Sequence, residues 1–286
     1  MARIVGVHGI NQEFDGSNTI YARWLPALKD GLERANAALT SDDDFKCAFY
    51  GDLFRESGQA KGTIPNYDVN DIDAEWEREF LQELWGEVLK VEEGELNPQK
   101  APVTKARVPR ILQEALSALS QSRFFGGVAE KFVIAFMKQV RLYLYDPEIR
   151  QQIRSRVSDC ITDDTRVLVG HSLGSIACYE SLCQHPEWPV KVLVTLGSPL
   201  GIQRLIFDRL EPPPTDSQGN WPGSVKTWIN IADAGDIVAL EKKLNPYFQG
   251  DVIDQLVNNG ADAHNANRYF TARETGEAIK LGLEDA

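Results

Sequence analysis

Apolar residues are concentrated in five short runs along the chain, with helical patterns between most of them. Three of the runs, at residues 3–8, 166–170 and 190–196, are nearly continuous in Val, Ile and Leu, which is typical of strands buried on both faces of a parallel sheet. In full, the runs are 3–8 (RIVGVH), 45–50 (FKCAFY), 166–170 (RVLVG), 190–196 (VKVLVTL) and 224–231 (SVKTWINI).

Helical patterns lie at residues 22–38, 146–160, 174–184 and 202–210. The second pattern opens with Asp-Pro-Glu, which provides an N-cap, a proline at the first helical position and an acid in the first turn. Strands that alternate with helices form right-handed βαβ units. We therefore predict an α/β fold with a mostly parallel sheet of about five or six strands and helices on both faces.

Residues 52–145 interrupt this alternation and are mostly helical in pattern. Acids are concentrated at 71–95, bases without an acid at 100–110, and apolar residues at 124–145. Two interpretations of this insertion stay open, namely a helical excursion packed on the sheet edge and a cap or lid over a site on the sheet. In either case we treat residues 1–286 as one domain.

Composition and charge limit the function. Hydrophobic residues make up 43 % of the chain and charged residues 25 %, as in an ordinary globular protein. The formal net charge of −12 argues against nucleic-acid binding, which requires basic residues to neutralise phosphates. Because a signal-peptide pattern and a long apolar segment are both missing from the sequence, we expect a cytoplasmic protein without a transmembrane segment.

One G-x-S-x-G pentapeptide stands out, Gly170-His171-Ser172-Leu173-Gly174. It follows a predicted buried strand and opens a predicted helix, which is the setting that exposes a nucleophilic serine on a sharp turn. A side chain at Gly170 or Gly174 would strike the neighbouring strand or helix. We therefore predict that Ser172 is a nucleophile at a helix N-terminus, where backbone N–H groups favour negative charge.

With this motif the chain resembles the α/β-hydrolase superfamily, in particular its lipases and esterases. The matching stretches are VLVGHSLGS at the predicted turn, VHGI near the N-terminus, TLGSPL after the fourth strand, and a late Asp and His. The resemblance implies a serine hydrolase whose triad follows the chain order Ser, acid, His. It does not cover residues 52–145, and the family's usual first two antiparallel strands are missing from the predicted elements.

Four histidines could accept the proton of the serine hydroxyl. His185 ends the helix after the serine, at the end remote from it, and His171 is the serine's immediate neighbour, so neither can serve as the base. His8 precedes the serine, contrary to the family order. His264 therefore remains as the predicted base.

Two aspartates are candidates for the acid, since the fifth predicted strand runs into Asp233 and Asp236. A carboxylate in the turn beyond a strand's carboxyl end would stand beside the nucleophile. The sequence GDIV is similar to the superfamily's acid turn and favours Asp236, with Asp233 as the alternative. Asp262 ranks third, because it is too close to His264 in sequence to approach its ring.

The tetrahedral intermediate also needs N–H donors. By analogy with the family, Leu173 would supply one, and the His8-Gly9-Ile10 turn the other, with Ile10 as the donor. No nucleotide-binding or metalloprotease motif is present, and the four cysteines show no metal-ligand spacing, so no cofactor or metal is expected.

The leading hypothesis is an esterase or lipase that acts on a small ester or lipid-like substrate. A thioesterase or peptidase would use the same triad. A non-catalytic binding or assembly module would use the charged part of the insertion as a partner surface. A third interpretation makes residues 100–110 and 124–145 a membrane-surface contact of an interfacial lipase.

Overall fold

The structure, a computed structural model, describes residues 2–55, 65–72, 74–92, 108–121 and 130–284. Its centre is one six-stranded sheet in the order β2-β1-β3-β4-β5-β6, and every pairing is parallel. The predicted α/β class and parallel sheet are confirmed. The strands are β1 (Ile4–Val7), β2 (Phe45–Ala48), β3 (Val167–His171), β4 (Val192–Leu196), β5 (Thr227–Asp233) and β6 (Val252–Val257).

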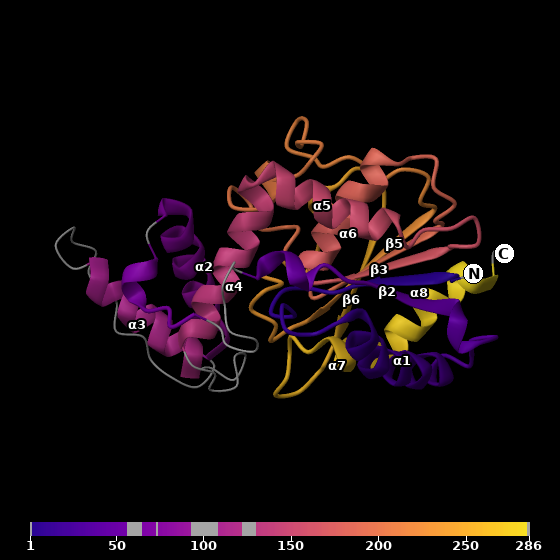
Figure 1. Cartoon of the computed structure of the whole chain (residues 1–286), viewed down its shortest axis with the longest axis horizontal. Coiled ribbons are helices and arrows are strands. Elements are labelled where there is room, and N and C mark those ends of the chain that lie inside the picture. Colours follow the sequence, from indigo (N-terminus) through magenta and orange to yellow (C-terminus); the bar gives the residue numbers. More distant parts are fainter. Residues whose placement is uncertain (1, 56–64, 73, 93–107, 122–129, 285–286) are drawn as a thin grey trace.

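Helices cover both faces of the sheet (Figure 1). One face packs against α1 (Ser17–Arg34), α7 (Ala266–Thr271) and α8 (Arg273–Glu284), and the other against α5 (Pro147–Ser158) and α6 (Leu173–Gln184). Successive strand residues alternate between the two layers. In β1, for example, Ile4 lies in the cluster with α1 and α8, and Val5 lies in the cluster with α5 and α6.

The five predicted strands correspond to β1–β5, but β6 was not predicted. Its sequence, VIDQLV, mixes polar with apolar residues, and Val252 is its one buried residue. As an edge strand, it leaves Ile253 and Leu256 exposed. A strand that is only partly buried has neither the continuous apolar run nor the strict alternation that identifies a strand in the sequence.

The predicted helix over residues 202–210 is wrong, and α1 begins and ends earlier than the predicted 22–38. Within 202–210 the chain makes a non-helical turn closed by the N–H of Ile206, which donates to the carbonyl of Ile202 at 3.0 Å, and then a short 3₁₀ turn at Phe207–Arg209. Arg204 has a φ of 59°, which a right-handed helix excludes. The apolar spacing there reflects burial in the core, not a helix.

Residues 52–145 contain α2 (Glu75–Glu92), α3 (Val108–Gln121) and α4 (Glu130–Tyr145), which form a helical lobe beyond one end of the sheet (Figure 1). Most of the basic stretch 100–110 and residues 124–127 lie outside the described residues. The interpretations as a partner or membrane surface therefore stay predictions. No helix in the described part of the chain combines the length and the apolar character needed to cross a bilayer.

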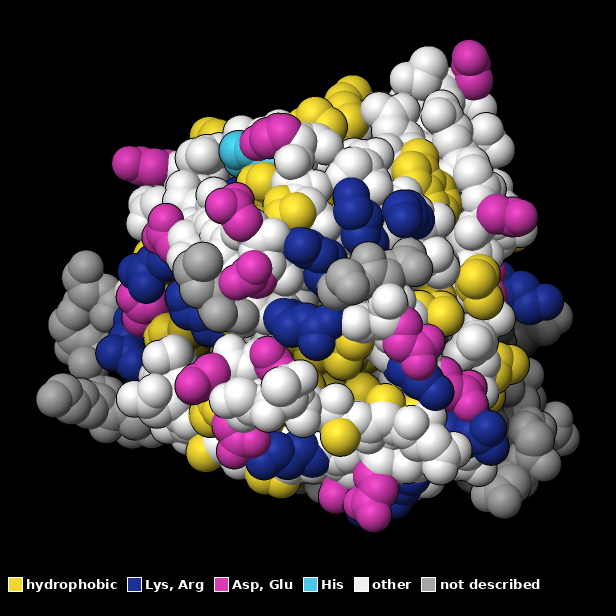
Figure 2. Space-filling model, turned by 90° about the vertical axis from the view of Figure 1, so that its right-hand side faces the viewer, with side chains coloured by type: hydrophobic (Ala, Val, Ile, Leu, Met, Phe, Trp, Pro, Cys, Tyr) yellow, Lys and Arg dark blue, Asp and Glu magenta, His cyan; other side chains and the backbone are white. Residues whose placement is uncertain are grey.

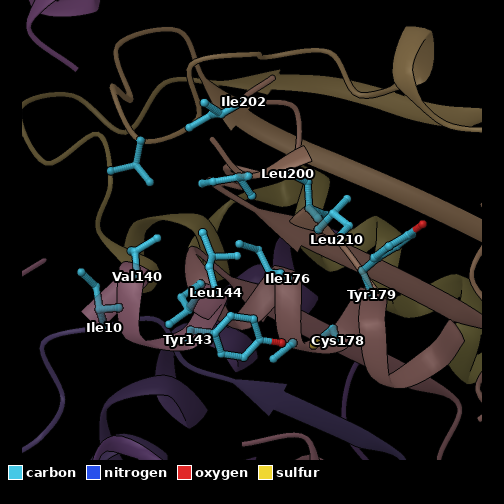
Figure 3. Close-up of a cluster of buried hydrophobic side chains, with 14 of the residues drawn as sticks. Ile10, Val140, Tyr143, Leu144, Ile176, Cys178, Tyr179, Leu200, Ile202 and Leu210 are labelled. Atoms are coloured by element: carbon cyan, nitrogen blue, oxygen red, sulfur yellow. The ribbon is translucent and has the colours of Figure 1, made fainter. Parts of the chain in front are cut away.

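Helix α4 is anchored in the core of the sheet domain. Figure 3 shows Val140 and Leu144 of α4 in one buried cluster with Ile176 of α6 and Ile10 of the loop after β1. Polar contacts add to this anchoring, because Tyr143 of α4 donates to the buried carboxylate of Glu180 at 2.6 Å. The same carboxylate forms a buried ion pair with Arg150 of α5. These contacts join α4, α5 and α6 into one layer.

The end of the sheet that carries the two termini is locally basic. Arg3, Arg166, Lys191 and Lys226 directly precede residues that are paired in register across β1, β3, β4 and β5, and Figure 2 shows Lys and Arg side chains gathered on this side of the molecule. The net charge of −12 is therefore unevenly spread. This basic row lies at the amino ends of the strands, whereas the carboxyl ends face the helical lobe.

Candidate active site

A cavity lies where the order of the strands reverses. From β1 the chain continues to β2 on one side, whereas β3 lies on the other side of β1. The loops that leave β1 and β3 therefore diverge and open a crevice at the carboxyl ends, where α/β sheets bind ligands. The cavity has a volume of about 400 Å³, and its lining includes Gly9 and Ile10 after β1, Ser172 after β3, and His264.

Ser172 joins β3 to α6 in a strained turn. Its φ of 54° and ψ of −127° are rare for a residue that carries a Cβ. A Cβ on Gly174 would lie 2.2 Å from the carbonyl oxygen of Val7, and a Cβ on Gly170 would lie 2.5 Å from the Cα of Ser175. Close packing therefore requires a glycine at both positions. The steric reason is the one predicted from the sequence, namely that a side chain would strike the neighbouring strand or helix.

Asp236 is the aspartate that contacts His264. It is fully buried in the turn after β5, and its Oδ2 lies 2.8 Å from His264 Nδ1. The same oxygen accepts a hydrogen bond from the Tyr269 hydroxyl at 2.7 Å. Its Oδ1 accepts from the backbone N–H groups of Val238 and Ala239 at 2.9 and 3.3 Å. Every lone-pair direction of this carboxylate is thereby fixed.

These contacts determine the protonation of the pair. Burial alone would raise the pKa of Asp236, but the His264 imidazole and the hydrogen bonds from His264 and Tyr269 outweigh it and lower this pKa to about 2. Asp236 is therefore an anion at neutral pH and can only accept. The hydrogen bond therefore requires a proton on Nδ1 of His264, so that in the neutral form of the ring Nε2 is the nitrogen that can accept a proton.

Asp233, the alternative acid, has a different role. One of its carboxylate oxygens accepts the N–H of Gly235 at 2.6 Å, and the other accepts the N–H of Asn259. The contact with Gly235 closes a turn in the backbone, and the contact with Asn259 joins this turn to the segment after β6. Asp262 is exposed and lines the cavity. Of the three aspartates considered, the structure places only Asp236 in hydrogen-bonding contact with the His264 ring.

His171 connects the serine turn to the loop that carries His264. Its Nε2 lies 2.9 Å from the carbonyl oxygen of His264, and the two rings are 4.6 Å apart between centroids. Since a carbonyl only accepts, Nε2 of His171 carries the proton. Burial, followed by the neighbouring His264, lowers the pKa of His171 to about 3, so the ring is neutral. His171 thus holds the backbone of His264 in position.

The two residues predicted as oxyanion donors flank Ser172. Leu173 is the first residue of α6, and the first N–H groups of a helix have no acceptor within the helix. Ile10 lines the cavity in the loop after β1. The next residue, Asn11, has a φ of 58°, and its N–H donates to Oε1 of Gln139 at 2.9 Å. Gln139 belongs to α4, so the helical lobe supports the loop that carries Ile10.

His8 and Gly9 stabilise the same loop. The N–H of Tyr50 donates to Nε2 of His8 at 3.1 Å, so the ring proton lies on Nδ1, which donates to the carbonyl of Gly9 at 2.5 Å. Burial lowers the pKa of His8 to about 4, and the ring is neutral. A Cβ on Gly9 would lie 2.7 Å from the Cβ of Ser172. Glycine at this position leaves room for the serine.

The cavity walls combine apolar and polar surfaces. Apolar side chains come mainly from α1, α4 and the loop after β5, and polar ones come mainly from the loop after β1 and from the start of α7 with the loop before it. Arg23 at the rim is paired with Asp15 and donates to Gln12 at 2.9 Å. The apolar lining residues are Ile10, Trp24, Phe132, Phe136, Ile237, Val238 and Ala266, and the amide side chains in the lining are Asn11, Gln12, Asn265 and Asn267.

The cysteines and acids give no sign of a metal site in the parts of the chain that the structure describes. No group of three or more His, Cys, Asp and Glu side chains there is arranged to hold an ion. Cys47, Cys160 and Cys178 are buried free thiols, and Cys183 is partly buried.

Three residues of this site were not recognised in the sequence. Tyr269 lies within the short helix α7 that follows His264, and no motif distinguishes it. Gln139 is a buried amide in an apolar helix, a pattern that could have indicated a polar contact. Gly197 lies in the TLGSPL stretch with a φ of 53°, and a Cβ there would lie 2.6 Å from Oδ2 of Asp236 and 3.1 Å from Nδ1 of His264. Gly197 therefore provides the space for that pair.

Comparisons of the chain with protein-family models, with curated proteins and with solved structures gave no significant match.

The two buried neutral histidines make stability depend on pH. Burial lowers the pKa of His8 to about 4 and the pKa of His171 to about 3 in the folded protein, below the ordinary histidine pKa of 6.5 that is expected in an unfolded chain. Below pH 6.5 the unfolded chain therefore binds more protons, and the free energy of unfolding falls as the pH is lowered. Each of the two histidines contributes a slope that approaches about 1.4 kcal/mol per pH unit between about pH 6 and its folded-state pKa, and a smaller slope between pH 7 and 6.

Urea unfolding at pH 7, 6 and 5 measures this slope. We expect His171→Gln to remove about one histidine's share of it. The matched control is His185→Gln, because His185 is partly exposed at the end of α6, where it pairs with Glu187. A slope that is the same in wild type and in His171→Gln would contradict the assignment of a neutral buried ring.

Proposed function

We propose that this protein is a serine hydrolase that cleaves carboxylic esters, with Ser172 as nucleophile, His264 as general base and Asp236 as the acid. The observation that carries the proposal is the hydrogen-bonded pair of His264 and buried Asp236 at a cavity lined by a serine on a strained turn. The resemblance to lipases and esterases at the G-x-S-x-G motif supports the same reaction class.

In this mechanism the Ser172 hydroxyl attacks the ester carbonyl carbon while Nε2 of His264 takes its proton. The Asp236 anion stabilises the resulting imidazolium through Nδ1. Backbone N–H groups of Ile10 and Leu173 would bind the oxyanion, and each such donor is typically worth a factor of about 10² to 10³ in rate. The imidazolium then protonates the leaving alcohol, and water hydrolyses the acyl-enzyme by the reverse proton path.

The cavity supports a small ester or lipid-like substrate. Its volume of about 400 Å³ is in the range of small-molecule sites. Phe132 and Phe136 of α4 provide an apolar surface opposite the polar loops, which suits an acyl chain with a more polar alcohol or head group. Because α4 is packed into the core and its Gln139 holds the Asn11 backbone, we infer that α4 is a fixed wall of the site and not a freely moving lid.

Hydrolysis of p-nitrophenyl acetate, butyrate and octanoate in a stopped-flow instrument tests this proposal. We expect a burst of p-nitrophenolate equal to the enzyme concentration, because acylation precedes slower deacylation. Matched thioester and anilide substrates serve as comparison. Cleavage of the thioester or the anilide without any ester cleavage would favour a thioesterase or a peptidase. No turnover of any substrate by folded protein would contradict the hydrolase proposal and favour a binding module.

A further inference from the structure

The hydroxyl of Tyr269 shares the carboxylate oxygen that holds His264. Tyr269 O–H and His264 Nδ1 lie 2.7 and 2.8 Å from the same atom, Oδ2 of Asp236. The backbone N–H of Asp233 lies 2.8 Å from the Tyr269 oxygen. An amide N–H can only donate, so the hydroxyl accepts from Asp233 and must direct its own proton at Asp236. The contact therefore has a fixed direction.

We propose that Tyr269 is a positioning residue that lowers the proton affinity of His264 by competing with it for Oδ2 of Asp236. This inference rests on the proposed function, in which His264 is the general base. An oxygen that accepts two hydrogen bonds shares its negative charge between them, so it stabilises an imidazolium less than an oxygen with His264 as its sole donor. The base is then unprotonated to a lower pH.

Burial strengthens this effect. Tyr269 and Asp236 are both fully buried, so water does not replace either partner, and hydrogen bonds in such surroundings are stronger than in water. Burial, and after it the Asp236 anion, raises the pKa of Tyr269 well above its usual value. The hydroxyl therefore keeps its proton and stays a donor over the whole pH range in which an enzyme would be assayed.

The local fold explains why a tyrosine at this position can act on the triad. The side chain of Asn265 caps α7 by accepting the N–H of Asn267, and this short helix directly follows His264. One compact segment thus carries both the base and the residue that competes with it. On the opposite side, Oδ1 of Asp236 is held by two backbone N–H groups, so the carboxylate cannot rotate away from either donor.

The other groups near His264 do not explain the same effect. Its surroundings comprise the neutral His171 from β3, Ser172 from the turn, Asp262 from its own loop, Arg23 from α1 across the cavity, and Lys242, whose ammonium binds the backbone carbonyl of Asp236. Removing the Tyr269 hydroxyl leaves all of these unchanged. A change in the titration of His264 on loss of this hydroxyl would therefore be attributed to the hydrogen bond that Tyr269 donates to Oδ2 of Asp236.

The test is Tyr269→Phe, which keeps the buried ring and removes the hydroxyl. We expect the titration midpoint of His264, followed by ¹⁵N NMR of the imidazole, to rise by about 0.5 to 1 pH unit, a roughly three- to tenfold change in proton affinity. We expect the acid limb of the pH profile of kcat/KM to move by the same amount. Tyr21→Phe is the matched control, because its hydroxyl is remote from the cavity and bonds the carbonyl of Asp42.

An unchanged or lower midpoint in folded Tyr269→Phe would overturn the proposal. If that variant does not fold, 3-fluorotyrosine at position 269 replaces it. Its more acidic hydroxyl is a stronger donor and should lower the midpoint, and a rise would contradict the proposal. The NMR titration needs no substrate, so it tests the role of Tyr269 even if the wild-type protein hydrolyses no ester. In that case only the activity assay fails.

Discussion

Ser172→Ala is expected to lower kcat for ester hydrolysis by about 10⁶-fold, because removing the nucleophile of a triad leaves only the contribution of the oxyanion site and of binding. The substitution removes one oxygen atom. It leaves a Cβ in place, so the strained backbone of the turn is under the same constraint in both proteins. Folding should therefore be preserved, and the loss should appear in kcat.

Steady-state kinetics on the best ester substrate, with a thermal melt of each protein, checks this expectation. Ser155→Ala is the matched control, since Ser155 is exposed on α5 on the far side from the cavity lining. Hydrolysis by Ser172→Ala within about tenfold of wild type is incompatible with covalent catalysis by this residue.

Asp236→Asn is expected to lower kcat by about 10⁴-fold, the loss typical of a triad acid replaced by its amide. The amide has nearly the same shape but no charge to stabilise the imidazolium. It can also donate to Nδ1 of His264, which places the ring proton on Nε2, the nitrogen that must accept the proton from serine. The side chain at position 236 thus keeps most of its shape, but His264 can no longer accept the proton of the serine hydroxyl.

Asp233→Asn is a matched control within the same turn. The carboxylate of Asp233 accepts backbone N–H groups of Gly235 and Asn259, and an amide oxygen can replace one of these contacts. We expect its kcat to stay within about tenfold of wild type and its thermal stability to fall. The reverse ranking of the two variants would assign the acid to Asp233.

Much of the fold could be predicted because local patterns determine it. Strands β1, β3 and β4 lie inside the sheet with helices on both faces, so their residues are nearly all apolar. Strand β6 lies at the edge, where five of its six residues are at least partly exposed, and the pattern disappears. At residues 202–210 the apolar spacing is real, but a residue at positive φ prevents a helix, and spacing alone does not indicate backbone conformation.

In the candidate site, too, the residues that belong to a local sequence pattern could be predicted, and those that depend on contacts between distant segments could not. Ser172 and its glycines belong to one contiguous motif, so sequence spacing is sufficient to identify them. Which of Asp233 and Asp236 contacts the His264 ring depends on where the turn directs each carboxylate, and this geometry is visible in the structure but not in the sequence. Gln139 and Tyr269 act through contacts between distant segments, so no local pattern marks their partners.

The most direct measurement of the central claim is intact-protein mass after treatment with a fluorophosphonate, which labels only an activated serine. Wild type, Ser172→Ala and His264→Ala are compared, with His185→Ala as the control for loss of a histidine outside the cavity. We predict one adduct on wild type and on His185→Ala, none on Ser172→Ala, and much slower labelling of His264→Ala. No adduct on folded wild type, or an adduct that persists on Ser172→Ala, would contradict an activated serine at position 172.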